Sequence, residues 1–311
     1  MYVRKGDPIN PDYKQFFKFS QTPFSNPSDS RALHYYNNGQ INEMDVAILK
    51  FVYENRIVTL DQFQRLFPDV YITQITDRLN KLLSTHFLNV FMLGDGNPEK
   101  QFQNDALAFY VLDFSSPALL YHLTNDEDMQ NWSSTLNVIS AGKVIKATML
   151  TDFYLTIQQK LKHKPLAYNC YRVFNSGKLK MIPRAELILN DNGKKKNFLI
   201  DIVDENDIYL GDKEKFREKL MRYETFYSKD AWDKYYDCTG NPEALPVLII
   251  VCDTVNTAVA INKMMMDLEI PNYRLTTLKL AQTDLETCLM KYDEKKGSLV
   301  RIKNKLFEES E

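Results

Sequence analysis

The spacing of apolar residues changes along the chain and predicts where its helices and strands lie. Residues 1–40 are mostly polar and hold four of the 12 prolines, so this segment is predicted to be a loosely packed extension. From position 41 onward, apolar side chains recur every three or four residues, which is typical of amphipathic helices. Three helices are therefore predicted, within 41–56, 59–68 and 71–87, with Asn42 and Thr59 as N-caps of the first two.

Two extended apolar runs follow the third predicted helix. "FLNVFML" at 87–93 and "ALAFYVLD" at 106–113 flank the polar segment "GDGNPEKQFQND". Three short helices followed by a two-stranded wing form the pattern of a winged helix-turn-helix, which we predict over 41–124. Residues 125–147 are expected to form a linker and part of a helix.

In a DNA-binding module of this kind, the third helix enters the major groove. The candidate DNA contacts are therefore its outward side chains and one lysine near the tip of the wing: Thr73, Gln74, Thr76, Asp77, Arg78, Asn80, Lys81 and Lys100. Residues 41–124 hold six basic and ten acidic side chains, so this region is acidic. Asp77 would repel phosphate unless it accepts a hydrogen bond from a cytosine amino group. Winged helices also dock onto proteins, and this interpretation stays open.

A second unit is predicted over 148–285, with residues 286–311 as a C-terminal tail. Its predicted order is helix, three strands, helix, strand, helix, strand, over 148–164, 167–175, 185–190, 197–203, 212–236, 244–253, 258–270 and 273–280. The run "ALPVLIIVCD" is continuously apolar, as in a central strand that is buried on both faces. The order predicts a mixed sheet flanked by helices. The fold class expected for the whole chain is thus α+β.

Two of the predicted strands form a hairpin that carries acidic residues. The runs 185–189 and 198–203 flank the turn residues "NDNG", which tolerate a positive φ. Glu186 lies in the first strand and Asp201 in the second, and Arg184 directly follows Pro183. Carboxylates inside strands of a predicted core need neutralising partners or a function.

The composition excludes several classes of protein. The chain has 311 residues, of which 44% are hydrophobic and 26% charged, typical of a globular protein. No segment approaches the roughly 20 apolar residues of a membrane span, and the first residues lack the apolar core of a signal peptide. The four cysteines are scattered and the four histidines isolated, so no metal site or disulfide framework is predicted. A reducing cytoplasm is the expected location.

The net charge of −2 hides an uneven distribution. Residues 141–197 hold twelve basic and three acidic side chains, a local charge of +9, so the rest of the chain carries −11. Such a basic block indicates contact with a polyanion, or else a solvated lysine-rich face. Its members nearest the hairpin are candidate DNA contacts: Lys178, Lys180, Arg184, Lys194, Lys195 and Lys196.

A carboxylate on each of the second and third strands resembles the layout of restriction-endonuclease-like enzymes of the PD-(D/E)xK type. This resemblance implies one Asp from the second strand, Glu-x-Lys from the third, and Mg²⁺ that activates water. Here Arg184 follows the proline, with Glu186 two residues on as a substitute ligand, and Val203 takes the lysine position after Asp201. Lys196, Lys215 or Lys219 could supply the missing ammonium group. We therefore expect no metal and no catalytic residues; Glu186, Asp201 and Lys196 are the candidates if the site is active.

The chain also resembles the replication-relaxation family of plasmid and mobile-element proteins over about residues 41–280. The similarity rests on "EMDVAILKFVYENRIVTLDQFQRLF", "LAFYVLDFSSPALLYHL", "IPRAELIL" with "NFLIDI", and "KLMRYETFY" ahead of "LPVLIIV". It implies a winged helix joined to a nuclease-like domain that acts in plasmid replication, DNA relaxation or conjugative transfer. Arg184 departs from the family by replacing the expected acid, with its guanidinium predicted to lie where a divalent cation would sit.

Three hypotheses follow from the sequence. The first is a non-catalytic DNA-binding protein of a plasmid or other mobile element, in which Glu186 and Asp201 pair with Arg184 and nearby lysines. The second is a protein-docking adaptor for a relaxase or replication initiator. The third is a Mg²⁺-dependent nuclease. The partners considered are double-stranded DNA, a relaxase or initiator, and a second copy of the chain; no membrane partner is expected.

Overall fold

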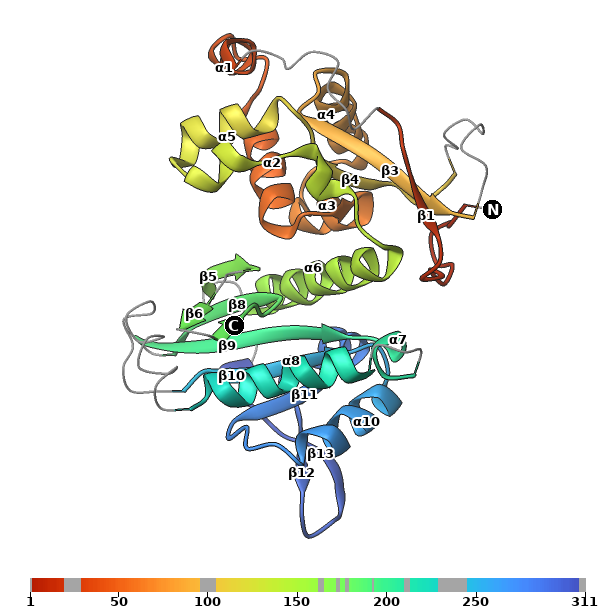
Figure 1. Cartoon of the computed structure of the whole chain (residues 1–311). Coiled ribbons are helices and arrows are strands. Elements are labelled where there is room, and N and C mark those ends of the chain that lie inside the picture. The colour runs from red at the N-terminus through yellow and green to blue at the C-terminus, as the bar shows by residue number, and fades with distance from the viewer. Residues whose placement is uncertain are drawn as a thin grey trace. The chain divides into compact units, whose positions relative to one another are not determined.

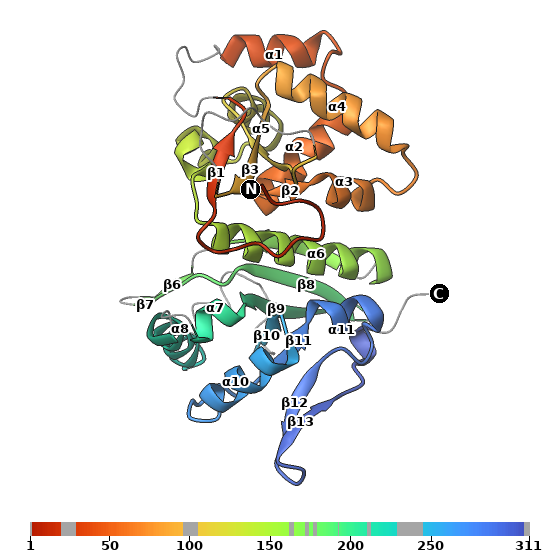
Figure 2. The same cartoon turned by 90° about the vertical axis from the view of Figure 1, so that its right-hand side faces the viewer.

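A computed structural model describes residues 2–19, 29–95, 105–161, 165–171, 174–176, 179–191, 193–209, 213–228 and 245–307. The chain forms two compact units, Met1–Thr151 and Asp152–Glu311. Figures 1 and 2 show their helices and strands from two directions. None of the described helices combines the length and the apolar character that crossing a lipid bilayer requires.

The three helices and two strands predicted for the first unit are present. They are α2 (Glu43–Asn55), α3 (Leu60–Leu66), α4 (Ile72–Ser84), β3 (Leu88–Gly94) and β4 (Phe109–Leu112). Both predicted N-caps are confirmed, because Asn42 accepts a hydrogen bond from Asp45 N and Thr59 accepts one from Gln62 N, each in a reciprocal capping box. A short strand, β2 (Val58–Thr59), joins α2 to α3 and pairs with β4.

The prediction of a loosely packed extension over 1–40 is wrong for the residues described there. Strand β1 (Lys14–Phe17) pairs antiparallel with β3 and completes a sheet of order β1-β3-β4-β2. Tyr2 and Val3 are buried, and α1 (Asp29–Asn37) follows in the chain. The strand has only four residues and depends on the hydrogen bonds of β3, so its own sequence carries a weak signal.

The segment 125–147 is more ordered than a linker. After α5 (Ser116–Thr124) come two 3-10 turns, Glu127–Asn131 and Ser134–Asn137, and then α6 (Ala141–Leu161). Ala141, Val144 and Ala147 of α6 belong to the same buried cluster as Phe91 and Val111 of the sheet. The start of α6 is therefore part of the core of the first unit.

A buried carboxyl group links the end of α4 to the end of β4. Asp113 is fully buried, and its Oδ2 lies 3.1 Å from Nδ1 of His86. Burial raises the pKa of Asp113 to about 6, although the hydrogen bond to His86 opposes this shift.

This raised pKa predicts a pH-dependent effect of Asp113→Asn. At pH 4 the carboxyl is largely neutral in the folded protein, so the substitution should change stability little. Between pH 4 and pH 6 the unfolded chain ionises this carboxyl while the folded protein keeps it neutral, so the unsubstituted protein loses stability over this range and changes little above it. The variant should then be more stable by about 3 kcal/mol at pH 7. Urea unfolding at pH 4, 5, 6 and 7 measures this, and an equal change at every pH would contradict it.

The second unit contains the mixed sheet that the sequence predicts. Its seven strands have the order β13-β12-β11-β10-β9-β8-β5, and β9, β10 and β11 are parallel. The strands are β5 (Pro165–Cys170), β8 (Ala185–Asp191), β9 (Lys194–Val203), β10 (Val247–Cys252), β11 (Tyr273–Thr277), β12 (Met290–Asp293) and β13 (Ser298–Arg301). A separate two-stranded sheet is formed by β6 (Phe174–Ser176) and β7 (Leu179–Met181). As predicted, β10 lies inside the sheet, between β9 and β11.

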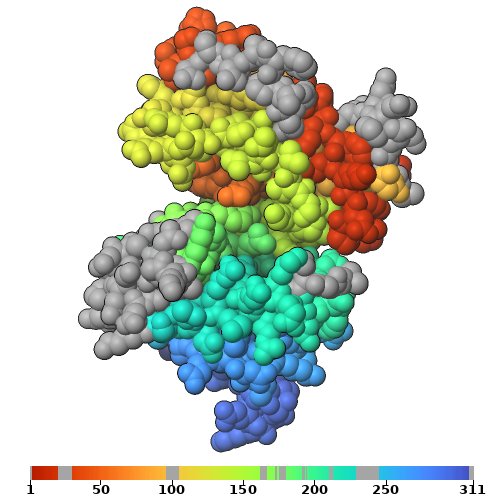
Figure 3. Space-filling view, viewed as in Figure 1, coloured from red at the N-terminus to blue at the C-terminus, as the bar shows by residue number. Residues whose placement is uncertain are grey.

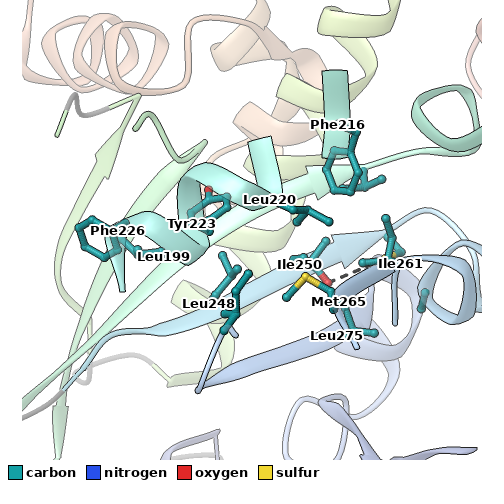
Figure 4. Close-up of a cluster of buried hydrophobic side chains, with 14 of the residues drawn as sticks. Leu199, Phe216, Leu220, Tyr223, Phe226, Leu248, Ile250, Ile261, Met265 and Leu275 are labelled. Carbon is teal, nitrogen blue, oxygen red and sulfur yellow. Dashed lines mark hydrogen bonds between the residues drawn. The ribbon is translucent and has the colours of Figure 1, made fainter. Parts of the chain in front are cut away.

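One face of this sheet is covered by two helices. These are α8 (Lys213–Phe226) and α10 (Val255–Met265), and the short helix α7 (Glu205–Tyr209) precedes α8. Figure 4 shows Leu220 and Tyr223 of α8 and Ile261 of α10 packed against Leu199 and Ile250 of the strands. On the other face, Tyr154 of α6 stacks on Tyr168 of β5 with ring centroids 3.8 Å apart. The sheet is thus covered on both faces.

Two boundaries predicted for this unit are wrong. The expected tail 286–311 contains the hairpin β12–β13, which extends the sheet beyond β11. The expected strand 273–280 ends at Thr277, whose side chain accepts a hydrogen bond from Leu280 N and begins α11 (Leu278–Thr283). An N-cap threonine ends the strand there, although the following residues remain apolar.

Candidate functional site

The hairpin β8–β9 forms as predicted and sets the positions of the acidic residues. The strands pair from Ala185↔Ile200 to Asp191↔Lys194, and Gly193 between them has φ +86°, which a side chain would oppose. Continued by one residue, this register brings Arg184 opposite Asp201. Glu186 pairs with Leu199, so it lies diagonally across from Asp201 on the same face.

Asp201 is the centre of a buried polar cluster beneath α8. Its carboxylate is 1% exposed and accepts hydrogen bonds from Nζ of Lys219 (2.7 Å to Oδ1) and from the hydroxyl of Tyr223 (2.9 Å to Oδ2). Nε of Arg184 lies 3.9 Å from Oδ1. The predicted approach of Arg184 to a hairpin carboxylate is confirmed for Asp201, but the closer cation is Lys219. We call Arg184, Asp201, Lys219 and Tyr223 the Asp201 cluster.

Burial and charge change the titration of two groups in this cluster. Burial lowers the pKa of Lys219; the charge of Asp201 opposes this effect, and that of Arg184 adds to it. About a quarter of the Lys219 side chain remains accessible. Burial also raises the pKa of Tyr223 well above its usual value, and the adjacent Asp201 carboxylate raises it further. Tyr223 is therefore a neutral hydrogen-bond donor at ordinary pH.

Glu186 occupies a neighbouring buried position. It is completely inaccessible, and Nδ2 of Asn169 in β5 donates a hydrogen bond of 3.1 Å to its Oε2. Asn169 pairs with Glu186 in the register of β5 and β8, so the two side chains share one face of the sheet.

The donors around Asp201 do not fit the Mg²⁺ ion that the resemblance to nucleases implies. A catalytic Mg²⁺ needs carboxylate oxygens that also reach water and the scissile phosphate. Here an ammonium and a phenol hydroxyl occupy the oxygens of Asp201, and both Asp201 and Glu186 are closed off from solvent. Across the parts of the chain that the structure describes, no group of three or more His, Cys, Asp or Glu side chains is arranged to hold a metal ion.

The two other candidate lysines, Lys196 and Lys215, occupy different positions from Lys219. Lys196 precedes Asp201 by five residues in β9, so strand alternation places it on the opposite face and roughly 17 Å along the strand. Lys215 is exposed, one turn before Lys219 on α8. Of the three lysines proposed from the sequence, Lys219 is hydrogen-bonded to Asp201.

The outward face of α4 carries the predicted polar residues but presents little positive charge. Thr73, Gln74, Asp77 and Asn80 are exposed, and Thr76 is half-buried. Nε of Arg78 donates to Oδ1 of the buried Asp45 (2.8 Å), and another nitrogen of its guanidinium donates to the carbonyl of Gln40 (3.1 Å). Nζ of Lys81 donates to that same carbonyl, 2.5 Å away. Both basic residues of α4 are thus bound within the protein.

The basic block contributes exposed lysines from the second unit. Lys180 in β7 and Lys195 in β9 are exposed, and Lys196 is half-buried. Lys194 begins β9, but its side chain lies outside the described part of the structure, as do Lys100 and Lys178 entirely.

The sequence-based prediction gives no role to Tyr223 and Asn169, which donate hydrogen bonds to the two buried carboxylates. The sequence predicts that Tyr223 is one of the apolar positions of α8. It follows Lys219 by four residues, which places both side chains on one helical face. Asn169 becomes informative only through the register of β5 with β8.

Comparison with known proteins finds little. No protein-family model matches the chain, and no curated protein matches it in sequence. A structure of restriction endonuclease FokI is similar with 10% identity, over 76% of this chain and 42% of FokI, at a TM-score of 0.28. A structure of FokI bound to DNA is similar with 11% identity, over 77% of this chain and 43% of FokI, at a TM-score of 0.26. The chain spans less than half of either FokI chain, and TM-scores of this size do not establish a common fold.

Proposed function

We propose that the protein is a non-catalytic DNA-binding protein of a plasmid or other mobile element, acting in replication, relaxation or transfer of its DNA. On this proposal the first unit is a winged helix, in the order α2, β2, α3, α4, β3, β4. The second unit is a nuclease-like domain that has lost its metal site. The resemblance to the replication-relaxation family motivates the biological setting.

The Asp201 cluster carries the non-catalytic part of the proposal. In a nuclease the acidic residues are open to metal and phosphate, whereas here Lys219 and Tyr223 engage Asp201 inside the fold. A cation supplied by the protein offsets the carboxylate charge that a metal would otherwise neutralise. The cluster therefore supports a structural role for Asp201.

The basic block supports the DNA-binding part of the proposal. Exposed lysines such as Lys180 on β7 and Lys195 on β9 belong to the same unit as Arg184. Lysine and arginine side chains neutralise phosphates and release condensed cations from DNA, which provides affinity without base recognition.

Binding and cleavage assays test this function together. We expect duplex DNA of about 30 base pairs to bind, with log Kd rising linearly with log salt at about 0.9 per phosphate contact. Fluorescence anisotropy between 50 and 300 mM NaCl measures the slope, and a flat response would contradict DNA binding. Supercoiled DNA incubated with Mg²⁺ or Mn²⁺ should stay uncut. Cleavage that disappears in Asp201→Asn would support the nuclease interpretation instead.

One observation favours the second candidate function, a protein-docking adaptor. The accessible face of α4 carries Asp77 but no basic side chain that is not already bound, and Tyr71 and Ile72 at its start are exposed, Tyr71 by 78%. An acidic, partly apolar helix face is better suited to a protein than to phosphate. Tyr71→Ala with Gln74→Ala would then abolish capture of a relaxase or initiator encoded beside this chain, while leaving DNA affinity unchanged.

A further inference from the structure

The cations of the Asp201 cluster lie nearer the surface than the carboxylate that holds them. Asp201 is 1% exposed, whereas the side chains of Arg184 and Lys219 are 24% and 26% exposed. Figure 3 shows α8, the helix that carries Lys219, at the surface of the protein. A metal site has the reverse order, with acidic groups facing the ligand. Here the partly accessible side chains of the cluster are the two cationic ones.

The hydrogen-bonding capacity of both cations is only partly used. Nε of Arg184 is buried and donates to none of the described residues; its guanidinium instead lies 6.0 Å from the centre of the Tyr171 ring. A guanidinium offers five N–H donors, so most of the capacity of Arg184 is available. Lys219 directs its ammonium at Asp201, which leaves at least one of its three N–H donors for another acceptor.

The two cations repel each other, and an anion would relieve this repulsion. The charge of Arg184 is one of the causes that lower the pKa of Lys219. Asp201 neutralises only one of the two positive charges. Glu186 on the same face adds a negative charge when ionised, but it is fully buried and hydrogen-bonded to Asn169. An acceptor with several oxygens could bind Arg184 through two parallel hydrogen bonds and Lys219 as a point charge.

We propose that Arg184 and Lys219 form a binding site for one phosphate group, at the position where a nuclease holds its metal ion. With the proposed function, on which this inference partly rests, the phosphate belongs to the backbone of bound DNA. The same chemistry would also accept inorganic phosphate. The site would position a DNA strand without cleaving it.

Arg184→Gln is the first test, because the buried Nε donates to no described residue and the fold should tolerate its loss. Removing one phosphate contact should lower the slope of log Kd against log salt by about 0.9, which weakens DNA binding about five-fold at 0.15 M salt. The matched control is Lys291→Gln, which removes an exposed charge on β12, three strands away from β9 in the sheet. Its slope should equal that of the unsubstituted protein.

A second variant keeps the total charge constant. Lys219→Gln together with Asp201→Asn removes one positive and one negative charge, and leaves two amide groups that can pair. If only the net charge of the protein matters, the slope of log Kd against log salt should be the same for this double variant as for the unsubstituted protein. The proposed site predicts a fall in the slope like that of Arg184→Gln. Urea unfolding of each variant establishes that it is folded under the assay conditions.

Inorganic phosphate separates this inference from the proposed function. Sodium phosphate at 20 mM, compared with chloride at equal ionic strength, should raise the melting temperature of the unsubstituted protein and not that of Arg184→Gln. If this holds but DNA does not bind, the anion site stands and the DNA-binding function fails. If DNA binds with a slope that neither variant changes, the inference is overturned. It is also overturned if neither DNA nor phosphate binds.

Discussion

Lys219→Met should destabilise the protein by about 3 kcal/mol, the largest effect that we expect from a single substitution in the second unit. The substitution leaves Asp201, at 1% exposure, with a hydrogen bond from Tyr223 but without its closest cation. Breaking one partner of a buried ion pair typically costs about 3–5 kcal/mol, because the remaining charge stays desolvated. The accessible part of the Lys219 side chain places the expected value at the lower end. Urea unfolding followed by circular dichroism measures it.

Two further variants show whether this cost comes from the stranded charge. Lys219→Met combined with Asp201→Asn should recover most of the loss, because a neutral amide can still accept the hydrogen bond of Tyr223. Lys215→Met, an exposed lysine one turn earlier on α8, should change stability by less than about 0.5 kcal/mol. A loss below about 1 kcal/mol for Lys219→Met would mean that Arg184 moves in and takes over the pairing with Asp201.

Arg78→Met should have the largest effect in the first unit, a loss of about 2–3 kcal/mol. Asp45 is completely buried, and its two carboxylate oxygens receive hydrogen bonds from Arg78 on α4, so the pair joins α2 to α4. Without the guanidinium, Asp45 keeps the hydrogen bond from the backbone of Asn42 but loses its counter-charge. Lys81→Met is the matched control. It loses one partly exposed contact with the carbonyl of Gln40 and should cost less than about 1 kcal/mol.

This experiment also decides what Arg78 does for DNA binding. If Arg78 is structural, the variant should bind DNA with an unchanged salt slope at temperatures well below its unfolding transition. A slope lower by about 0.9 would show instead that Arg78 leaves Asp45 to contact a phosphate. The double variant Asp45→Asn with Arg78→Met should restore stability while keeping whatever binding defect the loss of Arg78 produces.

The parts of the fold that the sequence predicts well are those with strong local signals. The hairpin β8–β9 combines a turn that favours positive φ with apolar runs on both sides, and the capping residues Asn42 and Thr59 each stand three residues before a side chain that returns the hydrogen bond. The continuous apolar run of β10 identifies an interior strand. In each case the information lies within one short continuous stretch of the chain.

The parts that the sequence misses depend on residues far apart. Lys219 reaches Asp201 only because α8 packs on β9 in one particular rotation, and the sequence offers Lys196 and Lys215 on equal terms. Likewise, β1 and the hairpin β12–β13 are short strands whose pairing partners supply most of their stability. The partners of Arg78 come from α2 and from the segment before it. A residue that the sequence predicts to contact DNA is therefore hydrogen-bonded within the protein.

The hairpin β12–β13 also bears on how the protein avoids aggregation. An edge strand with exposed backbone groups can pair with strands from other molecules. The apolar β10 would promote aggregation if it were an edge strand. Here the rim is β13, a strand of four residues, and Arg301 at its end is anchored by an ion pair with Asp284. A short, charged rim offers a poor template for another chain. On that side of the sheet, the three strands β11, β12 and β13 therefore separate the apolar β10 from the edge.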